Sequence, residues 1–149
     1  MPVKRFCLWL VDAAPNELRA LPEVMRRIEM VREERAKSKR PTTMELAKTP
    51  SLFGEIRQPN KQFLGIPKTS SERRAYIPMA FLKPIVIAGT DIFTISDATP
   101  FHFGVVTSQI HMAWVRYVCG QLKSDYRYSA GIVYNNYPWP STPSESPFG

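Results

Sequence analysis

Two segments of the chain carry apolar residues at three- and four-residue spacing, which is the period of a helix with one apolar face. The first begins after Asn16, a candidate N-cap, has Pro22 near its start and is closed by Pro41; its apolar positions are Leu18, Leu21, Val24, Met25, Ile28 and Val31. The second covers Thr107–Leu122 and has Gly120 near its end, where glycine often stops a helix; its apolar side holds Ile110, Ala113, Trp114, Tyr117 and Val118. The pattern predicts two amphipathic helices.

Short apolar runs bounded by Pro, Gly and Asp predict strands elsewhere. Phe6–Val11 is the first such run, whereas Thr42–Pro59 has no long period and predicts a short helix and loops. The later runs are Phe63–Ile66, Ala75–Met79, Pro84–Ala88, Ile92–Ile95, Phe101–Val106 and, after the second helix, Ile132–Tyr134. Together these elements predict an α+β fold, in which helices pack against a twisted, mostly antiparallel sheet.

The segment after the second predicted helix alternates in charge. If it is extended, alternate side chains lie on opposite faces: Lys123, Asp125 and Arg127 on one, and Ser124, Tyr126 and Tyr128 on the other. The charged face matches base edges in the DNA major groove, where Lys or Arg donates to guanine and Asp accepts from the cytosine amine. A solvated edge strand, whose charges serve solubility, is the alternative interpretation.

The composition is that of a basic folded domain. The chain has 149 residues, of which 44% are hydrophobic, and 20 Lys+Arg against 13 Asp+Glu give a formal net charge of +7. This length fits one domain, which we place at residues 1–140, followed by a Pro/Ser-rich disordered tail or linker at 141–149. A basic surface favours polyanions such as nucleic acid; a merely basic domain without such a partner is the alternative.

The cysteines and the apolar runs narrow the class of protein further. Cys7 and Cys119 lie far apart among apolar residues, without the Cys/His spacing of a zinc site, and we expect both to be reduced core residues. The apolar runs are far shorter than the roughly 20 residues that cross a bilayer, and the N-terminal run is too short for a signal peptide. We therefore expect a cytoplasmic protein with no metal and no membrane partner.

Two groups of basic residues are candidates for phosphate contact. SSERRAYIP, at Ser70–Pro78, places two hydroxyls and two arginines beside an aromatic residue, a combination that suits phosphate binding. A loop with surface arginines is the alternative. The first predicted helix also has a basic polar side, but the interleaved Glu29, Glu33 and Glu34 favour a solvated face there.

The remaining motifs do not indicate catalysis. YNNYPWP, at Tyr134–Pro140, is similar to the Asn/Asp-Pro-Pro-aromatic loop of amino-methyltransferases, but the two prolines after Asn are missing. No glycine-rich turn for a nucleoside cofactor appears either. A structural corner, with Trp139 packed and the Asn amides bonded to backbone, is the favoured interpretation. His102 and His111 have no nucleophile turn nearby, and we expect His111 to be a packed or capping residue.

The order of these motifs resembles one family. RFCLWL, PEVMRRIEMVREERAKS, PSLFGEIRQPN, SSERRAYIPMAFL, FHFGVVTSQIHMAWVRYVCGQLKSDYRYS and YNNYPWP together resemble the target-recognition region of MmeI-like (type IIL) restriction-modification enzymes and their DNA methylase relatives. The resemblance covers roughly Arg5 to Pro140, and Phe101–Pro140 is its most specific part. In that family the region follows an S-adenosylmethionine-dependent adenine methyltransferase domain, and often a nuclease. Neither domain is present here, so we expect this chain to be a fragment of a larger polypeptide.

The resemblance also implies roles for individual residues. In the family, two positions one residue apart, just after a helix, recognise one base pair; Lys123 and Asp125 match them in basic-then-acidic order, and Arg127 matches another recognition position. Lys123 donating to guanine and Asp125 accepting from the paired cytosine would select G over C. Gln121 departs from the family, in which Arg is common there. The candidate phosphate contacts are Arg57, Lys61, Lys68, Ser70, Ser71, Arg73, Arg74, Arg116 and Tyr128.

We therefore expect a bacterial, sequence-specific recognition domain for double-stranded DNA, belonging to an adenine-specific DNA methyltransferase of a restriction-modification system. Its partners would be duplex DNA and the methyltransferase domain of the same polypeptide, which would bind S-adenosylmethionine and flip the target adenine. With no catalytic or cofactor-binding residues of its own, the fragment should be inactive alone. A free-standing basic module, binding RNA or DNA without sequence choice, is the alternative.

Overall fold

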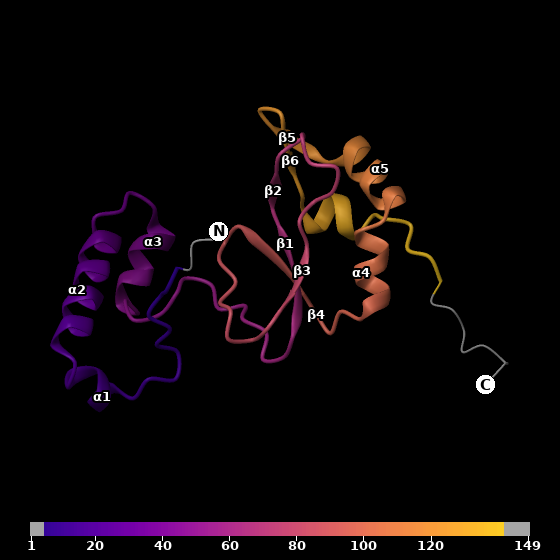
Figure 1. Cartoon of the computed structure of the whole chain (residues 1–149). Helices are drawn as coiled ribbons and strands as arrows, with labels where there is room; N and C mark the ends of the chain where they lie inside the picture. The colour runs from indigo at the N-terminus through magenta and orange to yellow at the C-terminus, as the bar shows by residue number, and fades with distance from the viewer. Residues whose placement is uncertain (1–4, 142–149) are drawn as a thin grey trace, which may run out of the picture. The chain divides into compact units, whose positions relative to one another are not determined.

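The computed structural model describes residues 5–141 of the chain. The chain divides into two compact units, Met1–Ile56 and Arg57–Gly149, which we describe separately (Figure 1). The sequence predicted one domain at 1–140, whereas two units form within it. The predicted tail, apart from Ser141, lies outside the described residues.

The N-terminal unit is helical. Each of its α-helices begins at a proline, which is favoured at the first helical position because its missing N–H has no partner there: the unit contains α1 (Pro15–Arg19), α2 (Pro22–Ala36), α3 (Pro41–Glu45) and the short η1 (Leu46–Lys48). The sequence predicted one helix starting at an Asn16 cap. Instead, Pro22 begins a second helix, and Asn16 lies inside α1, whose cap is Ala14.

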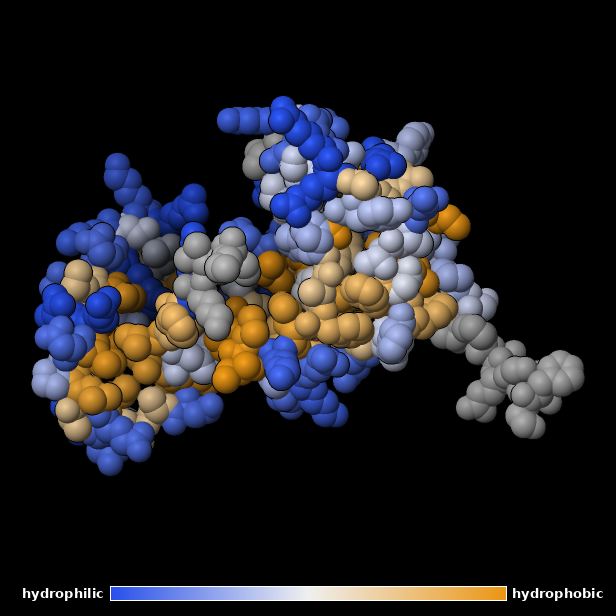
Figure 2. Space-filling view, viewed as in Figure 1, coloured by the Kyte–Doolittle hydropathy of each residue, from blue (hydrophilic) through white to orange (hydrophobic). Residues whose placement is uncertain are grey.

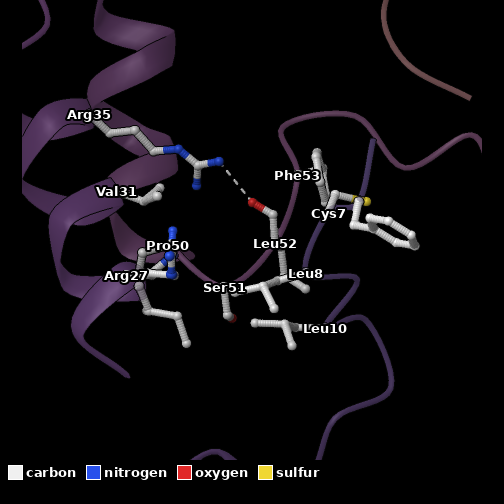
Figure 3. Close-up of a pocket in the computed structure, with 12 residues that line it drawn as sticks. Cys7, Leu8, Leu10, Arg27, Val31, Arg35, Pro50, Ser51, Leu52 and Phe53 are labelled. Atoms are coloured by element: carbon white, nitrogen blue, oxygen red, sulfur yellow. Dashed lines mark hydrogen bonds between the residues drawn. The ribbon is translucent and has the colours of Figure 1, made fainter. Parts of the chain in front are cut away.

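The side chain of Arg35 joins α2 to the segment that follows it. Its guanidinium donates to the carbonyl oxygens of Leu46 and Thr49, both at 3.0 Å, and to that of Leu52 at 2.9 Å, the last shown in Figure 3. These bonds border an apolar cavity of about 630 Å³ between α2 and the N-terminal segment. Phe6–Val11 contributes to this cavity but forms no strand, contrary to the prediction, and Cys7 is exposed rather than in a core.

The second unit contains two small antiparallel sheets, which confirms the α+β class but replaces the single predicted sheet. In the first sheet, β1 (Phe63–Pro67) lies between β3 (Ala80–Leu82) and β4 (Ile92–Ser96). In the second, β6 (Asp125–Arg127) lies between β2 (Thr69–Ser70) and β5 (Gly120–Leu122). Lys68 separates β1 from β2, so one stretch of chain passes from one sheet into the other.

Two helices and a π-helical turn complete the core of this unit. These are α4 (Pro100–Val106), α5 (Gln109–Val118) and η2 (Ala130–Tyr134), with α4 and α5 following each other along one side of the strands in Figure 1. Buried apolar side chains from every layer meet in one cluster: Leu64, Ile66, Ile77, Val106, Met112, Val115, Tyr126, Tyr128 and Val133.

Several predicted strands have other structures. Phe101–Val106 is helical because Thr99 and Pro100 form a helix start, and the Nδ1 atom of His102 accepts the Thr99 N–H at 3.1 Å. Pro84–Ala88 is a turn, closed by the Val86 N–H donating to the Lys83 carbonyl at 2.9 Å. Ala75–Met79 is also irregular, and Ile132–Tyr134 lies within η2.

Candidate nucleic-acid interface

Strands β5 and β6 form a tight hairpin with a two-residue turn. Leu122 is paired with Asp125, so Lys123 and Ser124 form the turn between them. Lys123 has a φ of 59°, in the left-handed region that glycine usually occupies at the first central position of a type II′ turn. The prediction of one extended strand through Lys123 is therefore wrong: the lysine lies at the tip of a hairpin, and the strand begins at Asp125.

Strand β6 separates its charged side chains from its aromatic ones. Arg127 is exposed and Asp125 is partly exposed, whereas Tyr126 and the following Tyr128 are buried. This alternation confirms that the two faces differ, and it places the aromatic face in the core. The sheet order also excludes the edge-strand interpretation, because β6 is the central strand. The polar face is thus held by the core beneath it and by a neighbouring strand on each side.

The basic turn after β2 leaves the sheet beside the hairpin. Ser70 is opposite Tyr126, so the antiparallel register carries the chain after Ser70 toward the Asp125 end of β6. The Arg74 N–H then donates to the Ser71 carbonyl at 3.1 Å, and the Arg73 N–H donates to Ser71 Oγ at 3.3 Å. Figure 2 shows hydrophilic side chains gathered over the end of this unit that carries the hairpin.

The other phosphate-contact candidates are distributed unevenly. Lys68 is exposed directly before β2, and Arg116 is exposed on α5, where it donates to the Ala75 carbonyl at 3.4 Å. Arg57 and Lys61 are exposed but precede β1, at the opposite end of that strand from Lys68. A five-residue strand spans roughly 17 Å, so these two residues are not brought to the hairpin.

Burial removes two residues from the predicted phosphate contacts. Ser70 is 6% exposed and Tyr128 is 1% exposed, so neither side chain reaches a surface that a phosphate could approach. Instead, Tyr128 Oη lies 3.0 Å from Nε2 of His111, in the core. Burial lowers the pKa of His111 to about 4 and raises the pKa of Tyr128 above its usual value, which keeps both groups neutral. His111 is a packed residue, as predicted.

Basic residues of the N-terminal helices form ion pairs, whereas those around the hairpin form none within the described part of the chain. On α2, Arg26 pairs with Glu23 and Arg32 with Glu29, each at 3.1 Å and on the surface, which agrees with a solvated helix face. Within residues 5–141, no such ion pair involves Arg73, Arg74, Lys123 or Arg127. The positive charge around the hairpin is therefore available to an external anion.

The YNNYPWP segment is a structural corner, as predicted. The Trp139 indole N–H donates to the Tyr134 carbonyl at 3.2 Å, and its ring meets that of Tyr137 at 5.6 Å between centroids. The Asn136 amide donates to the carbonyls of Gly131 and Ile132 at 2.9 and 3.2 Å. These bonds use the polar groups of the segment internally and close the end of the core.

The described part of the chain contains neither a cluster of metal ligands nor a membrane-spanning helix. Between residues 5 and 141, no three or more His, Cys, Asp or Glu side chains are grouped as ligands for a metal ion. Over the same range, no helix has the length and apolar content needed to span a membrane.

Comparison with known proteins identifies the family of the chain. The family described as "MmeI, target recognition domain" matches residues 2–141. The chain belongs to this family. DNA methyltransferase A of Bacillus subtilis (strain 168) is 39% identical to this target recognition domain over 136 residues. A solved structure of the type IIL restriction-modification enzyme MmeI in complex with DNA matches it with a TM-score of 0.90 and 45% identity.

The similarity covers nearly all of this chain but a small part of each relative. It includes 91% of the target recognition domain described here and 16% of DNA methyltransferase A. For the MmeI structure, the corresponding shares are 93% and 18%. The chain thus spans about a sixth of the length of these relatives.

Proposed function

We propose that this target recognition domain binds double-stranded DNA and selects its sequence through the β5–β6 hairpin. The observation that carries the proposal is the position of Lys123, Asp125 and Arg127: they occupy the tip and the polar face of one hairpin, above a buried aromatic face. The two-stranded hairpin is an element that the major groove of B-form DNA can admit.

The chemistry of these side chains suits one base pair and its neighbour. A lysine ammonium or arginine guanidinium donates to the O6 and N7 acceptors of guanine, and an aspartate accepts from the N4 amine of cytosine. Lys123 and Asp125 can therefore contact the two partners of one G·C pair, with G on the strand that Lys123 contacts. Arg127 lies two residues further along β6 and would contact a neighbouring pair.

Phosphate contacts supply the affinity in this proposal. Arg73 and Arg74 leave β2 beside the hairpin, and Lys68 precedes the same strand. Cations in such positions release counterions from the duplex and fix the register of the protein, but they do not distinguish sequences. Ser71 has its hydroxyl in the turn itself and would contribute a weaker polar contact.

We further propose that the complete polypeptide is an adenine-specific DNA methyltransferase of a restriction-modification system. The proposal rests on the name of the B. subtilis relative and on the MmeI structure, each about six times longer than the similar region. S-adenosylmethionine would supply the methyl group from another domain. The glycines described in this chain are isolated and none has a positive φ, so these residues do not fit a glycine-rich turn for that cofactor.

Selection from a random-sequence pool of double-stranded DNA tests the function directly. The 149-residue chain would be used at low salt, because a single recognition domain provides only part of the phosphate contact of a whole enzyme. We expect bound duplexes to share a short motif that contains a G·C pair. Uniform recovery of all sequences would instead support the alternative of a non-specific basic module.

A further inference from the structure

A buried polar contact joins α5 to the chain directly after Arg127. Nε2 of His111 lies 3.0 Å from Oη of Tyr128, and each residue is 1% exposed. Because Tyr128 follows Arg127, the contact holds the backbone beside one of the proposed base-contacting residues. Neither side chain can touch DNA, so any influence on base selection would be indirect.

The surroundings of this contact are aromatic. The His111 ring meets the Tyr137 ring edge-to-face at 4.5 Å between centroids, and the Tyr128 ring stacks with Phe93 at 6.5 Å. Aromatic pairs favour edge-to-face and offset arrangements but accept centroid distances from about 4.5 to 7 Å. A hydrogen bond, in contrast, tolerates only a narrow range of length and angle. The His111–Tyr128 bond therefore sets how deeply the Tyr128 ring enters the core.

The second ring nitrogen of His111 leaves Tyr128 as the sole hydrogen-bond partner of the ring among the described residues. Nδ1 of His111 is buried and has no hydrogen-bond partner among the described residues. If Nε2–H donates, the buried Tyr128 O–H has no acceptor, and if the Tyr128 O–H donates to Nε2, the buried Nδ1–H has none. In either tautomer the neutral imidazole makes one hydrogen bond, and that bond is to Tyr128. Tyr128 and Tyr137 are the titratable groups that contact this ring in the structure.

We propose that His111 and Tyr128 are positioning residues for base selection: their hydrogen bond fixes the end of β6 and thereby the directions of Asp125 and Arg127. The inference rests on the proposed function. Hydrogen bonds to base edges require side chains held within roughly 0.5 Å of the productive position. Attraction between a cation and a phosphate depends less on exact geometry than a hydrogen bond to a base edge does, so loss of this bond should weaken discrimination more than general DNA affinity.

The experiment compares variants that each remove one hydrogen bond with a variant that can keep the bond to Tyr128. Tyr128→Phe removes the hydroxyl and keeps the ring, His111→Leu removes the imidazole, and His111→Gln keeps an amide N–H that can donate to Tyr128. Trp114→Phe is the matched control. Trp114 lies on the same helix as His111, but its indole N–H donates to the Val133 carbonyl at 2.9 Å, and Val133 belongs to η2 and not to β6. Circular dichroism would confirm that each chain is folded at the assay temperature.

The measured quantity is a ratio of affinities. It compares the duplex selected from a random-sequence pool with the same duplex changed at one recognised base pair, at a fixed salt concentration. We expect Tyr128→Phe and His111→Leu to reduce this ratio about tenfold while affinity for unrelated duplex DNA stays within about twofold. His111→Gln and Trp114→Phe should keep the wild-type ratio. If His111→Leu does not fold, Tyr128→Phe and His111→Gln decide the result.

Two other outcomes would overturn the inference. Tyr128→Phe could keep the full wild-type ratio, or Trp114→Phe could lose discrimination as much as Tyr128→Phe does. The second result would mean that discrimination follows the overall stability of the fold. A wild-type chain that selects no motif would refute the proposed function itself, and that failure is visible before any variant is compared.

Discussion

Thr69 of β2 lies directly opposite Arg127 of β6 in the antiparallel register. On its other side, Arg127 is opposite Gly120 of β5, so its backbone lies between two strands. A side chain on a central strand has less freedom than one on an edge or a loop, and this suits hydrogen bonding to a base edge. Because Thr69 is followed by Ser70 and the basic turn, the proposed phosphate and base contacts share one small sheet.

Asp125→Ala distinguishes sequence recognition from general attraction to a polyanion. If Asp125 accepts from a cytosine amine, its loss relaxes preference at one base pair and costs roughly 1–3 kcal/mol of discrimination, while preference at other pairs remains. The affinities of duplexes with each of the four pairs at that position would be compared. A non-specific module predicts tighter binding to every duplex, because a repulsive carboxylate has been removed.

Arg73→Ala and Arg74→Ala test the phosphate contacts. Each should weaken binding to all duplexes similarly and reduce the slope of log affinity against log salt by about 1, because one fewer counterion is released. The measurement is a salt titration of binding to two unrelated duplexes. Arg26→Ala is the control, since Arg26 pairs with Glu23 on the surface of α2 and should leave the slope unchanged. A sequence-dependent loss in Arg73→Ala would contradict a phosphate role.

Lys123→Gly separates stability from recognition at the hairpin tip. A non-glycine residue in the left-handed region costs roughly 1–2 kcal/mol, and glycine avoids this cost while losing somewhat more chain entropy on folding. We therefore expect the free energy of unfolding to stay the same or rise by about 1 kcal/mol, while preference for G is lost. Denaturant unfolding and duplex competition measure the two effects. Marked destabilisation would show that the Lys123 side chain contributes to folding.

The low pKa of His111 predicts a stability change in mild acid. Its pKa is about 4 in the folded chain and near 6.5 in the unfolded chain, so the unfolded chain binds more protons between these values. The free energy of unfolding should therefore be constant, as far as this group is concerned, above pH 6.5 and fall as the pH decreases toward 4. Denaturant unfolding at pH 7, 6 and 5 would reveal the change. His111→Gln lacks this group, and an identical pH dependence in that variant would contradict the assignment.

The strongest apolar runs predicted two strands of the β-rich unit, whereas the helical period over Thr107–Leu122 was only partly right. The helix ends at Val118 and Gly120–Leu122 is strand β5; the predicted apolar side is also partly wrong, because Ile110 and Tyr117 are exposed and the buried residues are His111, Met112 and Val115. Phe63–Ile66 and Ile92–Ile95 became β1 and β4, in which Leu64 and Ile66 are buried in the core and Phe93 and Ile95 pack against it. The run at Phe101–Val106 was less informative, since a short apolar segment suits either a buried strand or a helix. The Thr99-Pro100 pair before it was the available signal for a helix start.

The hairpin shows that the period of apolar residues does not reveal turns or contacts between distant residues. Alternation over Asp125–Tyr128 predicted the two faces of β6, but the turn at Lys123 and Ser124 contains no glycine or asparagine that would announce it. The contact of His111 with Tyr128 could not be predicted from the sequence pattern either, because these residues are 17 positions apart and meet only through tertiary packing. The burial of Ser70 has the same origin, since β2 is defined by its pairing with β6.

Exchange of the two charges tests the central claim most directly. A chain carrying Lys123→Asp and Asp125→Lys keeps the net charge and reverses the order of donor and acceptor at the hairpin tip. Selection from a random-sequence duplex pool should give the wild-type motif with one change, C in place of G at a single pair in the strand concerned. An unchanged motif, or loss of preference at every position alike, would contradict recognition by this hairpin.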